Sequence, residues 1–244
     1  MQVLYGILFG LLVLVAGYLM GSIPNAVLIA KRRGVDITKV GSGNPGGTNV
    51  WRNLGYRAGL LCMTLDLAKS FSITFLVVLL LAFVPQLRDG SVLPLMSLQG
   101  HDHLNVYVCL TGLGTILGHS FPVFFRFRGG KNVMVTLGFL LATSPLMALL
   151  LLMVFLTALA LSKRVAVGSL AAAIGLLPVG LIPVLLALYG VPGYQYCGWY
   201  FAPNAFFLCD WVYYVFLLFM GLLVVWRHHA NIESLVEHQS HPDI

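Results

Sequence analysis

Long apolar stretches separated by short polar segments dominate this chain. A helix rises about 1.5 Å per residue, so about 20 apolar residues are enough to cross a hydrocarbon core of about 30 Å. The pattern therefore predicts membrane-spanning helices over residues 3–30, 57–84, 105–124, 165–188 and 211–226. Loops that contain Pro, Gly and polar residues are expected over residues 85–104 and 189–210.

A further apolar stretch, residues 133–161, is interrupted by Ser144-Pro145. Proline disfavours helical backbone in the residue before it, so we expect a hairpin of two shorter helices here. Pro178 and Pro183 predict kinks in the helix that follows. The chain is thus expected to be an all-α integral membrane protein, a seven-span helical bundle. Since no internal repeat or low-complexity segment divides it, residues 1–244 are expected to form a single domain.

Composition and charge support this class and predict an orientation. Hydrophobic residues make up 59% of the chain and charged residues only 9%, against about a quarter in soluble domains. Positive residues accumulate on the cytoplasmic side of membrane proteins, which predicts an outside N-terminus and a cytoplasmic C-terminus. Because no Lys or Arg precedes residue 31, the first stretch is expected to be a retained span rather than a signal peptide. All Lys and Arg residues except Lys69 and Arg88 lie in residues 31–57, 126–131 and 163–164 or at Arg227.

The first basic segment contains a glycine-rich loop, Gly41-Ser42-Gly43-Asn44-Pro45-Gly46-Gly47-Thr48-Asn49, with Arg52 close behind. Glycine-rich backbone turns tightly and exposes its N–H groups, which suits such a loop to bind anions. Thr48 is a candidate N-cap for a short helix ending near Gly55, which would put Arg52 near the positive end of the helix dipole. The alternative is a flexible turn between two spans.

A second basic segment contains Gly129-Gly130-Lys131. The two glycines would let the lysine approach a phosphate without bulk beside it, and an ammonium group suits phosphate. Arg126 and Arg128, in contrast, are typical of the snorkelling basic residues that flank most spans. His119, which precedes this segment, is expected to act mainly as a hydrogen-bonding residue at a helix end.

The last basic segment reads Arg227-His228-His229-Ala230-Asn231. On a helix, His228 and Asn231 share one face, whereas His229 points about 100° away. Histidine can act as a base or pair with an anion near neutral pH. Because adjacent histidines on a helix diverge, no metal site is expected here.

Two other features fall within or between the spans. Asp66 and Lys69 lie on one face of a predicted span, where an ion pair is the expected role and an ion path is the rival. The cysteines at 197 and 209 lie in an outside loop, where a disulfide and two free thiols are both open. Cys62 and Cys109 fall inside spans and are expected to be packing residues.

Taken together, these segments resemble one family, the acyl-phosphate-dependent glycerol-3-phosphate acyltransferases known as PlsY. The matching motifs are Gly21-Ser22-Ile23-Pro24 with Gly41 to Arg52, Asp66 to Lys69, Gly118 to Phe124 with Gly129-Gly130-Lys131, and Arg227 to Ile232. They run in family order from residue 21 to residue 232, so the resemblance covers nearly the whole chain. A further motif is only loosely matched by residues 163–169.

The resemblance implies a reaction and a site. A fatty acyl group would move from acyl phosphate to the 1-hydroxyl of sn-glycerol 3-phosphate, giving lysophosphatidate and phosphate, at a bacterial cytoplasmic membrane. No metal, cofactor or nucleic acid is implied, and a soluble enzyme that makes acyl phosphate is the implied functional partner. The resemblance implies that the catalytic residues are Ser42, Arg52, Lys131, His228 and Asn231. It implies substrate contacts by Gly41, Gly43, Asn44, Gly46, Thr48, Asn49, Gly129, Gly130 and His119.

The chain also departs from the family pattern. Gly47 stands where Ala is usual, Ser70 and Asn132 stand where Gly is usual, and Ala166 lacks a hydroxyl found in the family. Two other functions stay open. One is an acyltransferase that uses acyl-CoA or acyl carrier protein, although the His-x-x-x-x-Asp spacing of such enzymes occurs only at His238, in the polar tail. The other is a small-solute transporter, in which polar groups would gather near the membrane midplane.

Overall fold

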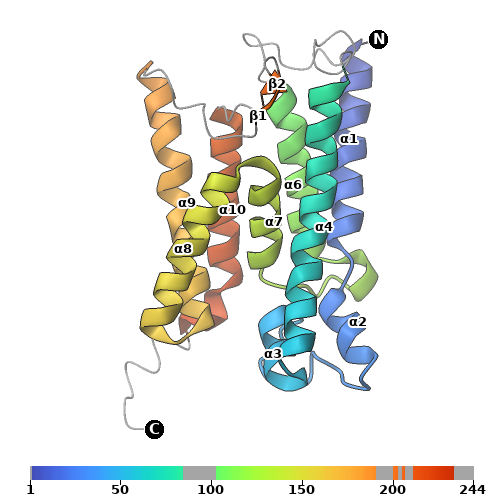
Figure 1. Cartoon of the computed structure of the whole chain (residues 1–244). Coiled ribbons are helices and arrows are strands. Elements are labelled where there is room, and N and C mark those ends of the chain that lie inside the picture. Colours follow the sequence, from blue (N-terminus) through green and yellow to red (C-terminus); the bar gives the residue numbers. More distant parts are fainter. Residues whose placement is uncertain (1, 85–102, 191–199, 203–204, 207–210, 234–244) are drawn as a thin grey trace.

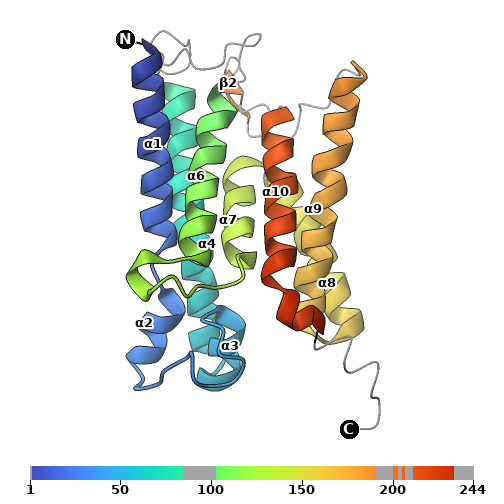
Figure 2. The same ribbon diagram turned by 180° about the vertical axis from the view of Figure 1, so that it is seen from behind.

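The computed structural model describes residues 2–84, 103–190, 200–202, 205–206 and 211–233. Its elements are α1 (Gln2–Gly21), α2 (Asn25–Lys31), α3 (Gly47–Leu54), α4 (Tyr56–Phe83), α6 (His103–Ser120), a 3-10 turn (Val123–Phe125), α7 (Val133–Thr143), α8 (Pro145–Ser162), α9 (Val165–Leu188), β1 (Tyr200–Ala202), β2 (Ala205–Phe206) and α10 (Trp211–Arg227). Figures 1 and 2 show two groups of upright helices, α1, α4 and α6 on one side and α8, α9 and α10 on the other, with α7 between them.

The prediction of an all-α membrane protein is confirmed for the described residues. Five helical stretches are long and apolar enough to cross a membrane, and α7 and α10 are shorter apolar helices. Their outer faces remain apolar, as at Leu12, which is 63% exposed, and Met153, which is 59% exposed. Such faces suit contact with lipid tails rather than water. One small addition is a two-stranded antiparallel ribbon, β1 and β2, in the segment expected to be only a loop.

The predicted hairpin at Ser144-Pro145 is confirmed, since α7 ends at Thr143 and α8 begins at Pro145. With its 11 residues, α7 extends only about 16 Å, roughly half the thickness of the hydrocarbon core. Figure 1 shows α7 and α8 meeting halfway along the bundle, so both of their other ends lie toward the same end. The number of full spans and the orientation in the membrane stay predictions. Pro178 and Pro183 both lie inside α9, which continues through them.

The predicted first span, residues 3–30, corresponds to a candidate membrane span over Val3–Lys31, but its helix breaks between α1 and α2, which was not predicted. Pro24 lacks an N–H and disfavours helix at Ile23, so α1 ends at Gly21 and α2 starts at Asn25. The break frees the carbonyl of Ile23, which accepts a hydrogen bond from Nζ of Lys69 at 3.0 Å.

Small residues allow α1 and α6 to pack closely. Gly17 and Gly21 of α1 face α6, where an added Cβ would meet the backbone carbonyls of Thr111 and Thr115. Gly114 and Gly118 of α6 face α1 in the same way. Each helix therefore carries a Gly-x-x-x-Gly pair, the pattern that lets helix backbones approach each other in membranes. This contact brings the break before Pro24 next to the end of α6.

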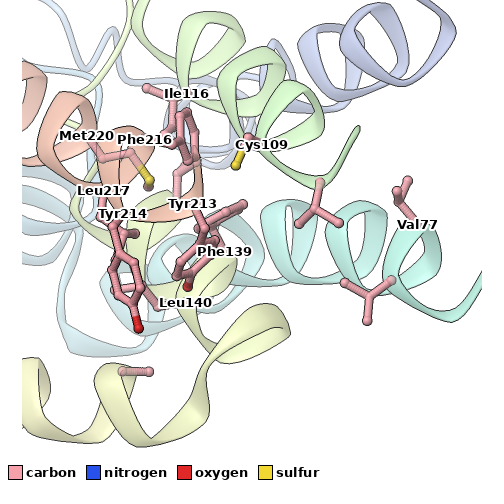
Figure 3. Packing of buried hydrophobic residues seen from close by; sticks show 14 of the residues in the cluster. Val77, Cys109, Ile116, Phe139, Leu140, Tyr213, Tyr214, Phe216, Leu217 and Met220 are labelled. Carbon is pink, nitrogen blue, oxygen red and sulfur yellow. The ribbon is translucent and has the colours of Figure 1, made fainter. Parts of the chain in front are cut away.

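The largest core cluster joins α7 and α10. Phe139 stacks on Tyr213 and meets Phe216 edge to face, with ring centres 6.0 and 5.2 Å apart (Figure 3). The hydroxyl groups of Thr143 and Tyr213 form a hydrogen bond of 2.8 Å, which satisfies both in this apolar setting. Because α7 follows Lys131 and α10 precedes His228, this packing fixes two candidate site residues relative to each other.

The cysteines inside the spans behave as expected. Cys62 and Cys109 are both buried, as expected of packing residues. Cys197 and Cys209 lie outside the described residues, so their disulfide stays a prediction.

Candidate active site

A polar cavity of about 250 Å³ gathers residues from the three basic segments that contain the predicted site residues. Its lining comes from both groups of helices and from the segments before α3 and after α10. The predicted site residues that line it are Ser42, Asn44, Gly46, Thr48, Asn49, Arg52, His119, Lys131, His228 and Asn231. Gly41, Gly43, Gly129 and Gly130 lie outside its lining.

The glycine-rich loop is held in place by Asn49, which is buried. Its Oδ1 accepts a hydrogen bond from the N–H of Ser42 at 3.1 Å, and its Nδ2 donates to the carbonyls of Ile37 and Val40 at 3.0 and 3.1 Å. Gly41 has a φ of 57°, and a Cβ there would collide with the Asn49 side chain. The amide of Asn49 has no donor left for a substrate, so we expect it to position the loop instead.

The start of α3 offers backbone donors to the cavity. Gly46 is the N-cap, so the expectation that Thr48 caps this helix was wrong, whereas its predicted end at Gly55 is confirmed by a φ of 86°. No side chain caps the start of α3 among the described residues. The first N–H groups of a helix have no intrahelical partner and attract anions. Because Thr48 and Arg52 also line the cavity, an anion there would meet both N–H groups and a guanidinium.

Gly129 and Gly130 shape the second loop rather than the cavity. A Cβ on Gly129 would collide with the backbone of Ser120, and one on Gly130 with the ring of His119. The N–H of Gly130 donates to the carbonyl of His119 at 3.0 Å, so it is already used. These two residues therefore let the loop lie directly against the end of α6.

Arg227 holds this loop from the other side, a role that the sequence analysis missed. Its Nη2 donates to the carbonyl of Gly129 at 2.8 Å, and its Nε and Nη2 both donate to that of Gly130 at 3.1 Å. Its position directly before His228 in the quoted motif was the available signal. Lys131, next in the loop, donates from Nζ to Oδ1 of Asn231 at 2.7 Å.

The cavity carries excess positive charge. Partial burial, followed by the nearby charges of Arg227 and Arg52, lowers the pKa of Lys131 below its usual value. Each of these positive charges therefore raises the free energy of the protonated form of its neighbours. A bound phosphate would relieve that repulsion, which makes an anion the natural occupant of this cavity.

His228 is buried, at 2% exposure, and held in one tautomer. Its Nδ1 lies 2.8 Å from the carbonyl of Val224, and a carbonyl can only accept, so Nδ1 carries the proton. Burial lowers the pKa of His228, the Val224 hydrogen bond opposes this, and Lys131 and Arg227 lower it further. The unprotonated Nε2 is thus available as an acceptor. His229 is exposed, as expected from its direction on the helix.

Beneath the cavity lies a buried ionic cluster. The predicted ion pair is confirmed, with Nζ of Lys69 2.9 Å from Oδ1 of Asp66. Lys69 also lies 3.0 Å from Nδ1 of His119, which fits the expected hydrogen-bonding role of that histidine. Asn25, which the sequence analysis did not single out, donates to Asp66 at 3.0 Å. The cluster joins α2, α4 and α6 at the floor of the site.

An apolar cavity of about 150 Å³ adjoins the polar one. It lies among α7, α8, α9 and α10, and Val133, Met134, Phe155 and Ser169 line both cavities. The cationic site therefore lies next to a space that suits a hydrocarbon chain. The remaining lining residues are Thr136, Leu137, Leu140, Leu151, Leu152, Ala172, Ala173, Leu176 and Val224.

Known proteins share both the sequence and the architecture of this chain. A family model described as glycerol-3-phosphate acyltransferase matches residues 11–238. A glycerol-3-phosphate acyltransferase of Chlorobaculum tepidum is 32% identical over 230 residues, which cover 92% of this chain and 92% of that protein. One of Listeria monocytogenes is 35% identical over 219 residues, which cover 89% of this chain and 88% of that protein.

Two solved structures are similar over nearly the same length. One is the crystal structure of PlsY (YgiH), an integral membrane glycerol 3-phosphate acyltransferase, in its glycerol 3-phosphate form. Its TM-score is 0.67 at 32% identity, covering 93% of this chain and 92% of that one. The lysophosphatidic acid form of that enzyme has a TM-score of 0.65 at 31% identity, covering 93% of this chain and 92% of that one.

Proposed function

This chain belongs to the glycerol-3-phosphate acyltransferase family, and on that premise we propose that its acyl donor is acyl phosphate. The chain is an acyltransferase of the membrane. In the proposed reaction a fatty acyl group moves from acyl phosphate to the 1-hydroxyl of sn-glycerol 3-phosphate. The products are lysophosphatidate and inorganic phosphate, which begins phospholipid synthesis.

One observation carries the choice of donor: the cationic cavity adjoins the apolar cavity through residues that line both. An acyl phosphate has its phosphate directly on the carbonyl carbon of the chain. When the chain lies in the apolar cavity, the phosphate must therefore fall among the cations. Burying each CH₂ group of the chain contributes about 0.8 kcal/mol, which would hold the donor in place.

The proposed chemistry uses positioning and charge. The oxygen of the 1-hydroxyl attacks the carbonyl carbon, the bond from that carbon to the bridging oxygen breaks, and phosphate leaves with the electron pair. The hydroxyl proton passes to a base, for which the unprotonated Nε2 of His228 is the candidate. Since acyl phosphate is a mixed anhydride with a good leaving group, no covalent enzyme intermediate is needed.

The site residues divide the two phosphates between them in this proposal. Arg52, the hydroxyl of Ser42 and the N–H groups at the start of α3 bind one phosphate. Lys131 neutralises the other, and the Oδ1 of Asn231 orients its ammonium group, 2.7 Å away. Preorganised donors of this kind stabilise charge that develops in the transition state.

The location and the partner are also proposals. The basic segments that line the site predict that it faces the cytoplasm, where glycerol 3-phosphate is found, in a bacterial cytoplasmic membrane. The donor would arrive sideways from the bilayer. A soluble enzyme that makes acyl phosphate must supply it.

Purified protein in detergent tests the donor directly. Glycerol 3-phosphate is combined with either palmitoyl phosphate or palmitoyl-CoA, and lysophosphatidate and free phosphate are measured. We expect both products in equal amounts from palmitoyl phosphate and none from palmitoyl-CoA. The Lys131→Ala variant serves as the inactive control. Equal or faster reaction with palmitoyl-CoA would contradict the proposed donor.

A further inference from the structure

Lys163 and Arg164 are the whole connection between two candidate membrane spans, Pro145–Ser162 and Val165–Leu186. So short a connection places both side chains at the edge of the hydrocarbon core, at the level of the lipid headgroups. Both side chains are exposed, and neither forms an ion pair within the described parts of the chain. Their charges can therefore meet an anion at the membrane surface.

The backbone of this turn has a defined conformation. Lys163 has a φ of 57°, in the left-handed region that glycine adopts most easily. The N–H of Arg164 donates to Oγ of Ser162 at 3.2 Å, and that hydroxyl donates to the carbonyl of Ala158 at 2.6 Å. Because glycine would suit this backbone better, lysine here indicates a use for its charge, in orienting the protein or in binding.

The turn lies beside the candidate site. Val165 and Ala166, the first residues of α9, line the polar cavity. Phe155 of α8 and Ser169 of α9 line the polar and the apolar cavity alike. The two helices that the turn connects therefore form part of the wall along which the acyl chain would lie, and the turn marks the headgroup end of that wall.

The chemistry of the donor fits this position. Acyl phosphate in a bilayer carries its negative charge at the headgroups while its chain lies among the lipid tails. A pair of cations at that level raises the local concentration of such a molecule beside the cavity. Resting on the function proposed above, we propose that Lys163 and Arg164 form a docking surface for the phosphate headgroup of acyl phosphate, from which the donor enters the polar cavity.

Neutralising both charges tests this surface. Rates are measured in mixed micelles of a neutral detergent and phosphatidylcholine, with each substrate varied in turn. Lys163→Gln combined with Arg164→Gln should raise KM for palmitoyl phosphate by about fivefold for each charge, roughly 25-fold in total. Its kcat and its KM for glycerol 3-phosphate should change less than about twofold, because a soluble substrate is not held at the headgroups.

Salt gives an independent measurement on the wild type. At about 1 M salt, charges are screened beyond about 3 Å, so an attraction between exposed groups should largely disappear. The KM of the wild type for palmitoyl phosphate should therefore rise toward that of the neutralised variant, whose own KM should change little.

Two matched controls use the same number of charges. Lys163→Arg combined with Arg164→Lys keeps both charges and should keep the wild-type KM. Lys31→Gln combined with Arg32→Gln removes two exposed charges at the end of α2, on the opposite side of the molecule from the turn (Figures 1 and 2), and should leave the KM for the donor unchanged.

Several results would overturn the docking surface. One is an unchanged KM for palmitoyl phosphate in the neutralised variant, with or without a lower kcat, as a purely topological role of the two charges would give. Another is an equal rise in both KM values, the result of a general field around the cavity. A rise that occurs only when phosphatidylglycerol is present would mean that the pair binds bulk anionic lipid. A wild type that makes no lysophosphatidate from palmitoyl phosphate would instead contradict the proposed function.

Discussion

Arg227 holds the loop that presents Lys131, and replacing it by lysine tests whether that loop position limits catalysis. Its guanidinium makes three hydrogen bonds to the carbonyls of Gly129 and Gly130, at 2.8, 3.1 and 3.1 Å. It also lies 5.6 Å from the ring centre of Phe121. Lysine keeps the charge but lacks the planar fork, so it can retain about one of these hydrogen bonds.

The size of the effect follows from those contacts. A hydrogen bond to a charged group contributes about 1.5–3 kcal/mol, and the lysine variant would lose two. If the loop relaxes to recover one of them, the net loss is about 1.5–3 kcal/mol, which corresponds to about 10- to 150-fold in rate. We therefore expect Arg227→Lys to lower kcat/KM for glycerol 3-phosphate by that factor. Arg126→Lys, an exposed residue of the same loop, should change it by less than about twofold.

A double variant shows whether Arg227 acts through Lys131. Steady-state rates with palmitoyl phosphate are compared for Arg227→Lys, Lys131→Ala and the two combined. Residues that work as one unit are not additive, so the double variant should be about as slow as Lys131→Ala alone. If the two losses multiply, Arg227 contributes independently of Lys131 and the reasoning is wrong.

Three further outcomes are expected. Lys131→Ala and Arg52→Ala should each lose about 2–4 kcal/mol of transition-state stabilisation, roughly 30- to 1000-fold in rate. The control variant His229→Ala, at an exposed residue, should be nearly unaffected. Near-normal turnover of Lys131→Ala at saturating substrates would contradict the assignment. Because burial lowers the pKa of His228, its acceptor form should persist at neutral pH and be lost only as pH falls below about 6.5. An acidic limb in kcat that is centred above pH 7, or that persists unchanged in His228→Gln, would exclude this role. Lys69→Met should leave the buried carboxylate of its partner unpaired and destabilise the protein by about 3–5 kcal/mol, seen as a lower melting temperature in detergent, and an unchanged melting temperature would argue against the pairing.

Much of the fold could be predicted because long apolar stretches indicate directly which segments can lie in the hydrocarbon core of a membrane. The hairpin at Ser144-Pro145 was predictable from backbone sterics, and the charge pattern required it. The same steric effect applies at Ile23-Pro24. The break there was not predicted, because the apolar residues on both sides were interpreted as one continuous span. The small ribbon of β1 and β2 carries no periodic signal of its own, since its strands have three and two residues.

The candidate site was predictable as a set of segments but not as a set of contacts. The family resemblance and the basic clusters pointed to Arg52, Lys131 and His228, and one cavity collects them. The role of Asn49 depends on where the chain passes at Ile37 and Val40, which no local pattern encodes. The apolar cavity depends on how α7, α8, α9 and α10 pack against one another, which their sequences alone do not give.

The buried cluster under the site explains how these segments acquire one geometry. Asp66 and Lys69 sit on α4, yet Lys69 reaches the carbonyl that the break before Pro24 releases and the ring of His119 on α6. A buried ion pair adds little net stability, because desolvation offsets its attraction, but it tolerates only one arrangement of its partners. The glycine contact between α1 and α6 brings those partners within reach. The cluster therefore fixes the register of the helices from which both anion-binding loops extend, and two of its members, Asp66 and His119, also line the cavity.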